Sequence, residues 1–310
     1  MDVRRALLAG LAGMSLLVSG CARTPDADAA RSAVAARDLG AAQVVRGLVY
    51  ARRDSGPLAL DLYLPRRAGT RTPFLVYAHG GGWDAGVRTL DADRGATEAL
   101  TTQRLVERGY AVATVDYRLT GVAKAPAQVV DVADAVRWLQ ANAGRWHLDP
   151  DRVGLWGASA GGHLVAQLGA VAGDPAKPGG GLRGIRAVVD WFGPTDLSAE
   201  AQTAHPELTG YAKRVITELL GCLPVDCPAV ADASSPIKNL SGDEPPFLLQ
   251  QGTADSLVPV VQSLDFAAEL RRRGVPVEMH PYEGLDHGFG RGPRTEAIAD
   301  TATAFVAGHV

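Results

Sequence analysis

The sequence lacks the excess of basic residues that proteins binding nucleic acids usually carry. Its 31 lysines and arginines are outnumbered by 34 aspartates and glutamates, so the formal net charge is −3 at pH 7. The arginines are scattered along the chain, and the densest basic spot, residues 271–273, is expected to be the solvated end of a helix. We therefore expect no nucleic-acid partner.

Cysteine is also scarce, with three in the whole chain. Two of them, Cys222 and Cys227, lie close together and predict a small disulfide loop, with two unpaired buried thiols as the alternative. Their segment contains no histidine and no further cysteine that could complete four metal ligands. We therefore expect no metal site.

The third cysteine, Cys21, ends a segment with the features of an export signal. Arg4 and Arg5 precede an apolar run over residues 6–18, which is too short to span a bilayer comfortably, and small residues follow it. Residues 18–21, Val-Ser-Gly-Cys, resemble the lipobox of bacterial lipoproteins. The resemblance implies that Cys21 is acylated and that the chain is exported and lipid-anchored to the cell envelope. An ordinary cleaved signal with an incidental cysteine is the alternative.

Three regions follow from this pattern. Residues 1–21 are expected to be the signal segment. Residues 22–42 are rich in alanine, aspartate and arginine and lack aromatic residues, which indicates a tether. Residues 43–310 show no internal repeat and no further boundary, so we expect a single catalytic domain there.

Within that domain, apolar runs alternate with amphipathic segments. Residues 44–50 and 58–64 flank a Gly-Pro turn and predict two strands, the second half-buried and antiparallel. Strands buried on both faces of a parallel sheet read as continuous apolar runs, and such runs occur at residues 74–78, 111–115, 153–156, 187–192, 247–249 and 275–279. Helical patterns occupy 97–108, 127–143 and 261–273. The alternation predicts an α/β fold with a mostly parallel central sheet flanked by helices.

Ser159 is the candidate nucleophile. It is the serine of a G-x-S-x-G motif at residues 157–161, which directly follows the apolar run ending at Trp156 and precedes a helical segment. A sharp turn from strand to helix lifts such a serine above the sheet, and glycines two residues away let the neighbouring backbone approach closely.

A second motif, His79-Gly80-Gly81-Gly82-Trp83, follows the strand predicted at 74–78. It resembles the HGGG oxyanion loop of lipases and esterases. By that resemblance the oxyanion donors are the N–H groups of Gly81 and Gly82, with Gly80 as a further candidate, together with the N–H of Ala160. His79 is expected to brace this loop.

A serine nucleophile needs a base, and the base needs an acid that orients it. Asp255 follows the strand at 247–249, and His287 lies in the loop after the last predicted strand, so both fit the chain order serine, acid, histidine. Asp286 and Glu283 are rival acids, but their nearness in sequence makes the Nδ1 atom of His287 hard for them to reach.

Taken in order, these motifs resemble the α/β-hydrolase esterases of the hormone-sensitive-lipase-like group, especially the BD-FAE branch of feruloyl-esterase-like enzymes. Further matches are Asp116-Tyr117-Arg118-Leu119, the Gly252-x-x-Asp255-x-x-Val258-Pro259 segment and His287-Gly288-Phe289. The resemblance implies an α/β-hydrolase fold and hydrolysis of carboxylic esters through an acyl-enzyme, with no cofactor. It extends from about residue 44 to the end.

The chain departs from this group in three places. Ala158 stands where the lipase-like branch often has an acidic residue, and Gln251 replaces a histidine, which we expect to affect the chemistry little. The region before residue 79 is too short for a large N-terminal cap. We therefore expect a small cap or none, with any cover coming mainly from the tether or from residues 197–240, over a fairly open pocket.

The function predicted from the sequence is hydrolysis of small or polysaccharide-linked esters with short acyl, acetyl or feruloyl groups. Since the histidine base must be neutral, activity should rise through about pH 6–7. One alternative is a peptidase like the catalytic domain of prolyl oligopeptidases, although no propeller domain is present in the sequence. The other is a non-catalytic, lipid-anchored binding protein on a hydrolase scaffold.

Overall fold

The computed structural model describes residues 39–41, 43–66, 71–90, 96–204, 209–290 and 292–310. The predicted signal segment, Cys21 and nearly all of the predicted tether lie outside the described residues. Among the described helices, none combines the length and the apolar character needed to cross a membrane.

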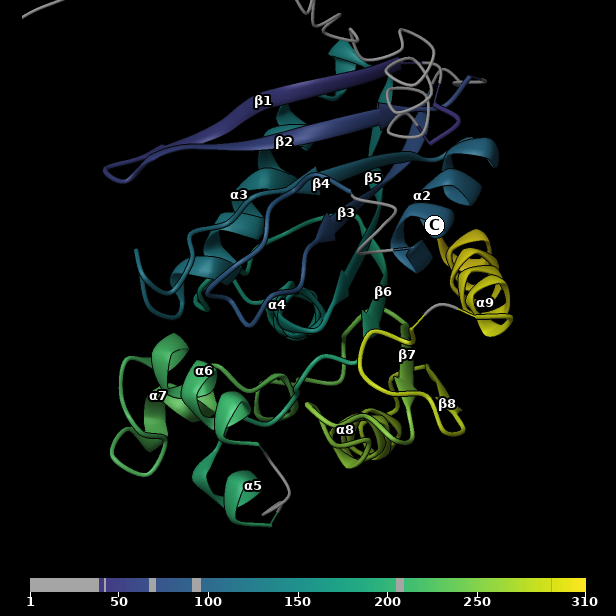
Figure 1. Ribbon diagram of the computed structural model, residues 1–310. Coiled ribbons are helices and arrows are strands. Elements are labelled where there is room, and N and C mark those ends of the chain that lie inside the picture. Colours follow the sequence, from purple (N-terminus) through teal and green to yellow (C-terminus); the bar gives the residue numbers. More distant parts are fainter. Residues whose placement is uncertain (1–38, 42, 67–70, 91–95, 205–208, 291) are drawn as a thin grey trace, which may run out of the picture.

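The described strands form one eight-stranded sheet in the order β1-β2-β4-β3-β5-β6-β7-β8 (Figure 1). β2 pairs antiparallel with β1 and β4, and every other pairing is parallel. The bounds are β1 Gln43–Arg53, β2 Gly56–Leu64, β3 Thr72–Ala78, β4 Ala111–Val115, β5 Leu148–Ala158, β6 Ile185–Trp191, β7 Phe247–Gly252 and β8 Val277–Tyr282. The predicted mostly parallel sheet is confirmed.

Helices cover both faces of this sheet (Figure 1). Side chains of α3 (Ala127–Ala141), α4 (Ala160–Val171) and α8 (Val261–Arg272) share one hydrophobic cluster with Phe74 and Val76 of β3. Side chains of α2 (Ala96–Glu107) and α9 (Arg294–His309) share a second cluster with Leu75 and Tyr77 of the same strand. Because neighbouring strand residues point to opposite faces, the two clusters are the two layers of the core. This is the α/β-hydrolase arrangement that the resemblance implied.

The three predicted helices are present, and each end lies within two residues of the prediction. Two of them are followed by a glycine with positive φ, Gly109 at 96° and Gly274 at 79°, which allows the chain to leave the helix. Short 3₁₀ turns occupy Ala143–Arg145 and Pro236–Lys238. α9 is an addition to the prediction, and it completes the layer in which α2 lies.

Two predicted strands differ from the structure in their surroundings. β8 begins at Val277 and is only partly buried, because it is the last strand of the sheet and has a neighbour on one side only. β2 is buried from Leu60 to Leu64, although an alternating half-buried strand was predicted. Its polar residue Asp61 can be buried there because its carboxylate accepts hydrogen bonds from Arg88 Nε at 2.9 Å and from the N–H of Gly47 at 2.8 Å.

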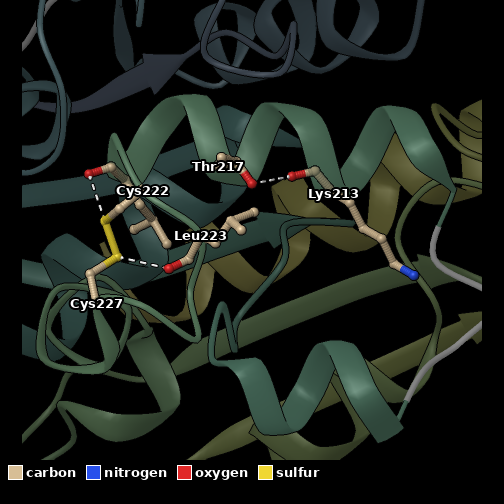
Figure 2. The surroundings of a disulfide bond; sticks show 6 residues. Lys213, Thr217, Cys222, Leu223 and Cys227 are labelled. Atoms are coloured by element: carbon tan, nitrogen blue, oxygen red, sulfur yellow. Dashed lines mark hydrogen bonds between the residues drawn. A yellow bond between two sulfur atoms is a disulfide. The ribbon is translucent and has the colours of Figure 1, made fainter.

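The segment between β6 and β7 forms three short helices beside the sheet: α5 (Ala199–Ala204), α6 (Gly210–Leu220) and α7 (Pro228–Ala233) (Figure 1). α6 ends at Gly221, whose φ of 81° allows the chain to turn. Immediately afterwards, Cys222 and Cys227 form the predicted disulfide, which closes the turn between α6 and α7 (Figure 2). The disulfide therefore joins the two ends of the connection that follows α6.

Candidate active site

Ser159 lies at the sharp turn between β5 and α4, with φ at 54° and ψ at −119°. Non-glycine residues rarely adopt positive φ, and strain of this kind is concentrated at functional sites. The turn needs glycine at position 161, because a Cβ atom there would lie 2.0 Å from the carbonyl oxygen of Ala78. The close approach of α4 to β3 thus explains why glycine follows the serine in this motif.

His287 connects the serine to a carboxylate. Its Nε2 lies 2.9 Å from Ser159 Oγ, and its Nδ1 lies 2.9 Å from Asp255 Oδ2 and 3.1 Å from Oδ1. An ionised carboxylate can only accept, so Nδ1 carries the proton and Nε2 accepts a hydrogen bond from the serine hydroxyl. The structure brings together the three residues predicted as nucleophile, base and acid.

Asp255 is held by its own loop. Its Oδ1 accepts hydrogen bonds from the N–H groups of Leu257 at 2.9 Å and Val258 at 2.8 Å, and its Oδ2 accepts one from Gln251 at 2.8 Å. The Asp255 side chain is 1% exposed and that of His287 is 16% exposed. The carboxylate is therefore fixed and shielded, while the imidazole remains open to the cavity.

The rival acids are engaged elsewhere in the described part of the chain. Asp286 Oδ1 accepts hydrogen bonds from the N–H groups of Ser256 at 2.8 Å and His287 at 2.7 Å, and these donors lower the pKa of Asp286. Glu283 accepts a long hydrogen bond, 3.5 Å, from the hydroxyl of Thr253. Neither carboxylate is bonded to the His287 ring in that part of the chain.

The predicted oxyanion loop follows β3 and lies against the serine. A Cβ atom on Gly80 would be 3.3 Å from Ser159 Cβ, and Gly81 has φ at 113° in a turn where a Cβ atom would meet the carbonyl oxygen of Ala85 at 2.4 Å. Within the described residues, no hydrogen bond occupies the N–H of Gly80, Gly81, Gly82 or Ala160. The amides predicted as oxyanion donors are therefore not engaged by other groups in that part of the chain.

His79 lies behind this loop. Its ring stacks on Tyr117 at a centroid distance of 4.3 Å, and its Nδ1 donates to the carbonyl oxygen of Gly80 at 2.7 Å. The Tyr117 hydroxyl donates to the His79 carbonyl oxygen at 2.9 Å. Burial lowers the pKa of His79, so the ring is neutral and its contacts are those of a residue that supports the loop.

A cavity of about 670 Å³ opens above the serine. Its walls come from the oxyanion loop, from the loops after β6 and β7, from α2 and from α6. The residues around it include Tyr77, Trp83, Leu90, Glu98, Phe192, Pro194, Asp196, Tyr211, Ala212, Val215, Ile216, Leu257, Val258 and Gln262. The cover expected from residues 197–240 is therefore supplied by α6.

Several contributors to the site were not predicted from the sequence. Phe192, with φ at 45°, packs edge-on against the His287 ring at 4.8 Å. Arg214 of α6 forms an ion pair with Asp84, just after the oxyanion loop, at 3.1 Å. These contacts join segments far apart in the chain, and no local pattern marks them. Gln251 was singled out only as a departure from the expected histidine.

Two buried ionisable groups lie beneath the site. Asp190, at the end of β6, accepts a hydrogen bond from the N–H of Gly193 at 2.9 Å, and burial raises its pKa to about 7. His163 of α4 donates from Nε2 to the carbonyl oxygen of Ser234 at 2.8 Å, and burial lowers its pKa to about 4.

A third ionisable group lies in the cavity wall, where burial raises the pKa of Glu98 to about 7. The described residues contain no group of three His, Cys, Asp or Glu side chains that could hold a metal ion.

Comparison with known proteins shows that this chain is similar to esterases. Residues 60–270 match the family model BD-FAE. Esterase LipC of Mycobacterium tuberculosis (strain ATCC 25618 / H37Rv) is 29% identical over 272 residues, which is 82% of this chain and 65% of the relative. Esterase LipQ of the same strain is 32% identical over 244 residues, 77% of this chain and 56% of the relative. The chain thus spans a little over half to about two thirds of these relatives.

Solved structures agree with this likeness. A truncated carbohydrate esterase from gut microbiota has a TM-score of 0.71 and 25% identity, covering 87% of this chain and 96% of its own. Est2 of the Planctomycetes species Thermogutta terrifontis, with propionate bound, has a TM-score of 0.68 and 26% identity, covering 87% of this chain and 95% of its own. The agreement extends over most of both structures.

Proposed function

This chain belongs to the BD-FAE family, and we propose that it is a serine hydrolase that cleaves carboxylic esters through an acyl-enzyme intermediate. The observation that carries the proposal is the hydrogen-bonded series Ser159–His287–Asp255 at the floor of the cavity. The serine has a base within hydrogen-bonding distance, and the base has an acid that fixes its tautomer, as nucleophilic catalysis requires.

The reaction follows from these positions. His287 Nε2 takes the proton of Ser159 Oγ as the oxygen attacks the ester carbonyl carbon, and Asp255 stabilises the imidazolium. The N–H groups of Gly81, Gly82 and Ala160 donate to the oxyanion of the tetrahedral intermediate. When that intermediate collapses, the C–O bond to the alcohol breaks and His287 protonates the leaving oxygen. Water, deprotonated by His287, then releases the acid by the same steps.

The substrates we propose are neutral esters with short acyl, acetyl or feruloyl groups, either small or linked to a polysaccharide. A volume of about 670 Å³ is within the usual range for small-molecule sites. The described lining contains the acids Glu98 and Asp196 but no lysine or arginine, so an anionic acyl group would be disfavoured. Similarity to a carbohydrate esterase and to an esterase with bound propionate supports the same substrate range.

We also propose that the chain is exported and lipid-anchored to the bacterial cell envelope through Cys21. The support is the basic start, the short apolar run and the cysteine that follows small residues. The Cys222–Cys227 disulfide agrees with an oxidising compartment, because disulfides are rare in the reducing cytosol.

The test of the proposed function is hydrolysis of p-nitrophenyl acetate by the pure protein beside Ser159→Ala. We expect turnover by the wild type only, faster for acetyl and butyryl than for octanoyl esters, with methyl ferulate assayed in parallel. A peptide amide should be a poor substrate. Preference for the amide would favour a peptidase, and failure of a fluorophosphonate to label Ser159 in folded protein would favour a non-catalytic role.

A further inference from the structure

Gln251 is a fully buried residue near the end of β7, and its amide touches the proposed catalytic acid. Its Nε2 donates to Asp255 Oδ2 and to the carbonyl oxygen of Val258, both at 2.8 Å, and its Oε1 accepts from Ser263 Oγ at 2.8 Å. The two partners of the NH₂ group can only accept, so the contacts leave one orientation for the amide.

The contact falls on the carboxylate oxygen that lies closer to the imidazole. His287 Nδ1 is 2.9 Å from Asp255 Oδ2 and 3.1 Å from Oδ1. Oδ1 is already bonded to two backbone N–H groups, whereas Oδ2 has Gln251 and the imidazole as its donors in the described structure. Apart from the His287 ring, Gln251 is therefore the side chain that donates to this carboxylate in the described structure.

We propose that Gln251 is a positioning residue that orients Asp255 and moderates its pull on the proton of His287. The inference rests on the proposed function. A glutamine donates without titrating, so the support it gives to Asp255 is constant across the working pH range. A histidine at this position, as the resembling esterases often have, could acquire a positive charge beside Asp255 at low pH.

Other ionisable groups surround this pair and must be separated from the effect. Asp286 is the neighbour of His287, and its lowered pKa keeps it ionised. Asp196 and Glu98 line the cavity, and Asp190 lies beneath the serine turn. Glu98 and Asp190 have pKa values raised to about 7, so they titrate within the pH range that the experiment must cover. A control variant must keep all of them.

Gln250 offers that control, since it is the same residue type, adjacent in β7 and equally buried. Its Oε1 accepts from Trp191 Nε1 at 2.6 Å, and its Nε2 donates to the Tyr282 hydroxyl at 2.5 Å. Its side chain points to the opposite face from Gln251 and has no hydrogen bond to Asp255 among the described contacts. Leucine at either position removes a buried amide, but only Gln251→Leu removes a donor to Asp255.

The experiment measures the pH dependence of kcat/KM for p-nitrophenyl acetate in the wild type, Gln251→Leu and Gln250→Leu. Without the Gln251 donor, the Asp255 carboxylate stabilises the protonated, inactive form of His287 more strongly. The acidic limb of the kcat/KM profile, where activity rises with pH, should therefore move to higher pH by about half a unit. kcat should fall about tenfold with little change in KM. Gln250→Leu should leave the limb at its wild-type position.

Two further variants keep the test decisive. Ser263→Ala removes only the hydroxyl that orients Gln251 and should shift the limb in the same direction by a smaller amount, even if Gln251→Leu fails to fold. Gln251→His keeps a donor to Asp255, so it should retain most of the kcat that Gln251→Leu loses. The inference would be overturned if the acidic limb of the kcat/KM profile lay at the same pH in all three variants, Gln251→Leu, Ser263→Ala and Gln250→Leu. Absence of ester hydrolysis in the wild type would instead contradict the proposed function.

Discussion

Asp255 and Asp286 both lie near His287, but they accept hydrogen bonds from different partners. Asp255 bonds to Nδ1 of the ring, whereas Asp286 bonds to backbone N–H groups, including that of His287 itself. Only Asp255 can therefore fix the tautomer of the imidazole. The difference makes a matched pair of substitutions informative.

Asp255→Asn should lower kcat for p-nitrophenyl acetate by ~10⁴-fold, because an amide cannot stabilise the imidazolium and favours the wrong tautomer. Asp286→Asn keeps an acceptor for the backbone and should change kcat by less than about threefold. Steady-state kinetics of both variants, with circular dichroism to confirm folding, provide the measurement. If Asp286→Asn were the more damaging change, Asp286 would be the better candidate for the acid.

The buried carboxyl group of Asp190 should make the free energy of unfolding depend on pH. Its folded pKa, about 7, is above the ordinary aspartate value of 3.8 because the carboxyl is buried. The stability that the buried neutral form contributes is complete below about pH 4 and is lost as the pH rises through about 7. Asp190→Asn keeps an acceptor for Gly193 and does not ionise, so the unfolding free energy of the variant should rise relative to that of the wild type as the pH increases, by ~3 kcal/mol at most between pH 5 and pH 8.

The measurement is urea unfolding of the wild type and Asp190→Asn at pH 5 and pH 8. The difference in unfolding free energy between the two proteins should shift in favour of the variant at pH 8. Asp265→Asn, at an exposed position on α8, is the control and should show a flat difference. A pH-independent difference for Asp190→Asn would mean that the carboxyl is already ionised at pH 5.

α6 forms a wall of the substrate cavity and is tied to the oxyanion loop. Arg214 bonds to Asp84 and lies 5.1 Å from the centroid of the Tyr211 ring. Tyr211 lines the cavity, is 44% exposed, and its hydroxyl would be 2.6 Å from a Cβ atom on Gly82. The helix thus places an aromatic ring in the cavity wall beside the predicted oxyanion loop.

Tyr211→Ala should lower kcat/KM for aryl esters such as phenyl acetate about tenfold, through KM, because it removes the apolar and aromatic contact. Ethyl acetate has no aromatic group to pack on the ring, so its hydrolysis should fall clearly less than that of phenyl acetate. Leu223→Ala is the control, since Leu223 is exposed after α6 but does not line the cavity. Equal losses for both esters would indicate a general disturbance of the site.

The strands that support the site were predictable, because each is a short apolar run bounded by turn residues. β4 was predicted at the bounds observed, Ala111–Val115, and its residues are all buried. The helices α5 to α7 were foreseen only as a covering segment. α5 and α7 have six residues each, which is too short for a clear periodic signal. α6 does carry one, because its buried residues recur at helical spacing, and the prediction did not use it. Their contribution to the cavity became visible only with the structure.

For the whole molecule, the motifs predicted which loops carry the serine, the acid and the histidine. The sheet order that brings them together has β4 between β2 and β3, and no local signal in the sequence predicted this order. Contacts such as Gln251 with Asp255 or Phe192 with His287 depend on side-chain packing between loops. The pattern of residues along the chain does not show which side chains of distant loops will be in contact.

The remaining prediction concerns where the molecule resides. The sheet begins at Gln43, so about twenty residues separate it from Cys21, and at ~3.5 Å per extended residue the tether could hold the site up to ~70 Å from a membrane. Each buried acyl methylene adds about 0.8 kcal/mol of membrane affinity, so two or three chains on Cys21 would retain the protein firmly.

Cys21→Ser should therefore move the protein from the detergent-extractable membrane fraction to the soluble fraction, with unchanged specific activity on p-nitrophenyl acetate. The control is the Cys222→Ser, Cys227→Ser double variant, which also loses cysteines but should stay with the membrane. Fractionation followed by immunoblotting, with mass spectrometry of the N-terminal peptide, makes the measurement. Retention of Cys21→Ser in the membrane fraction would contradict the lipid anchor, because no other acylation site is proposed near the start of the chain.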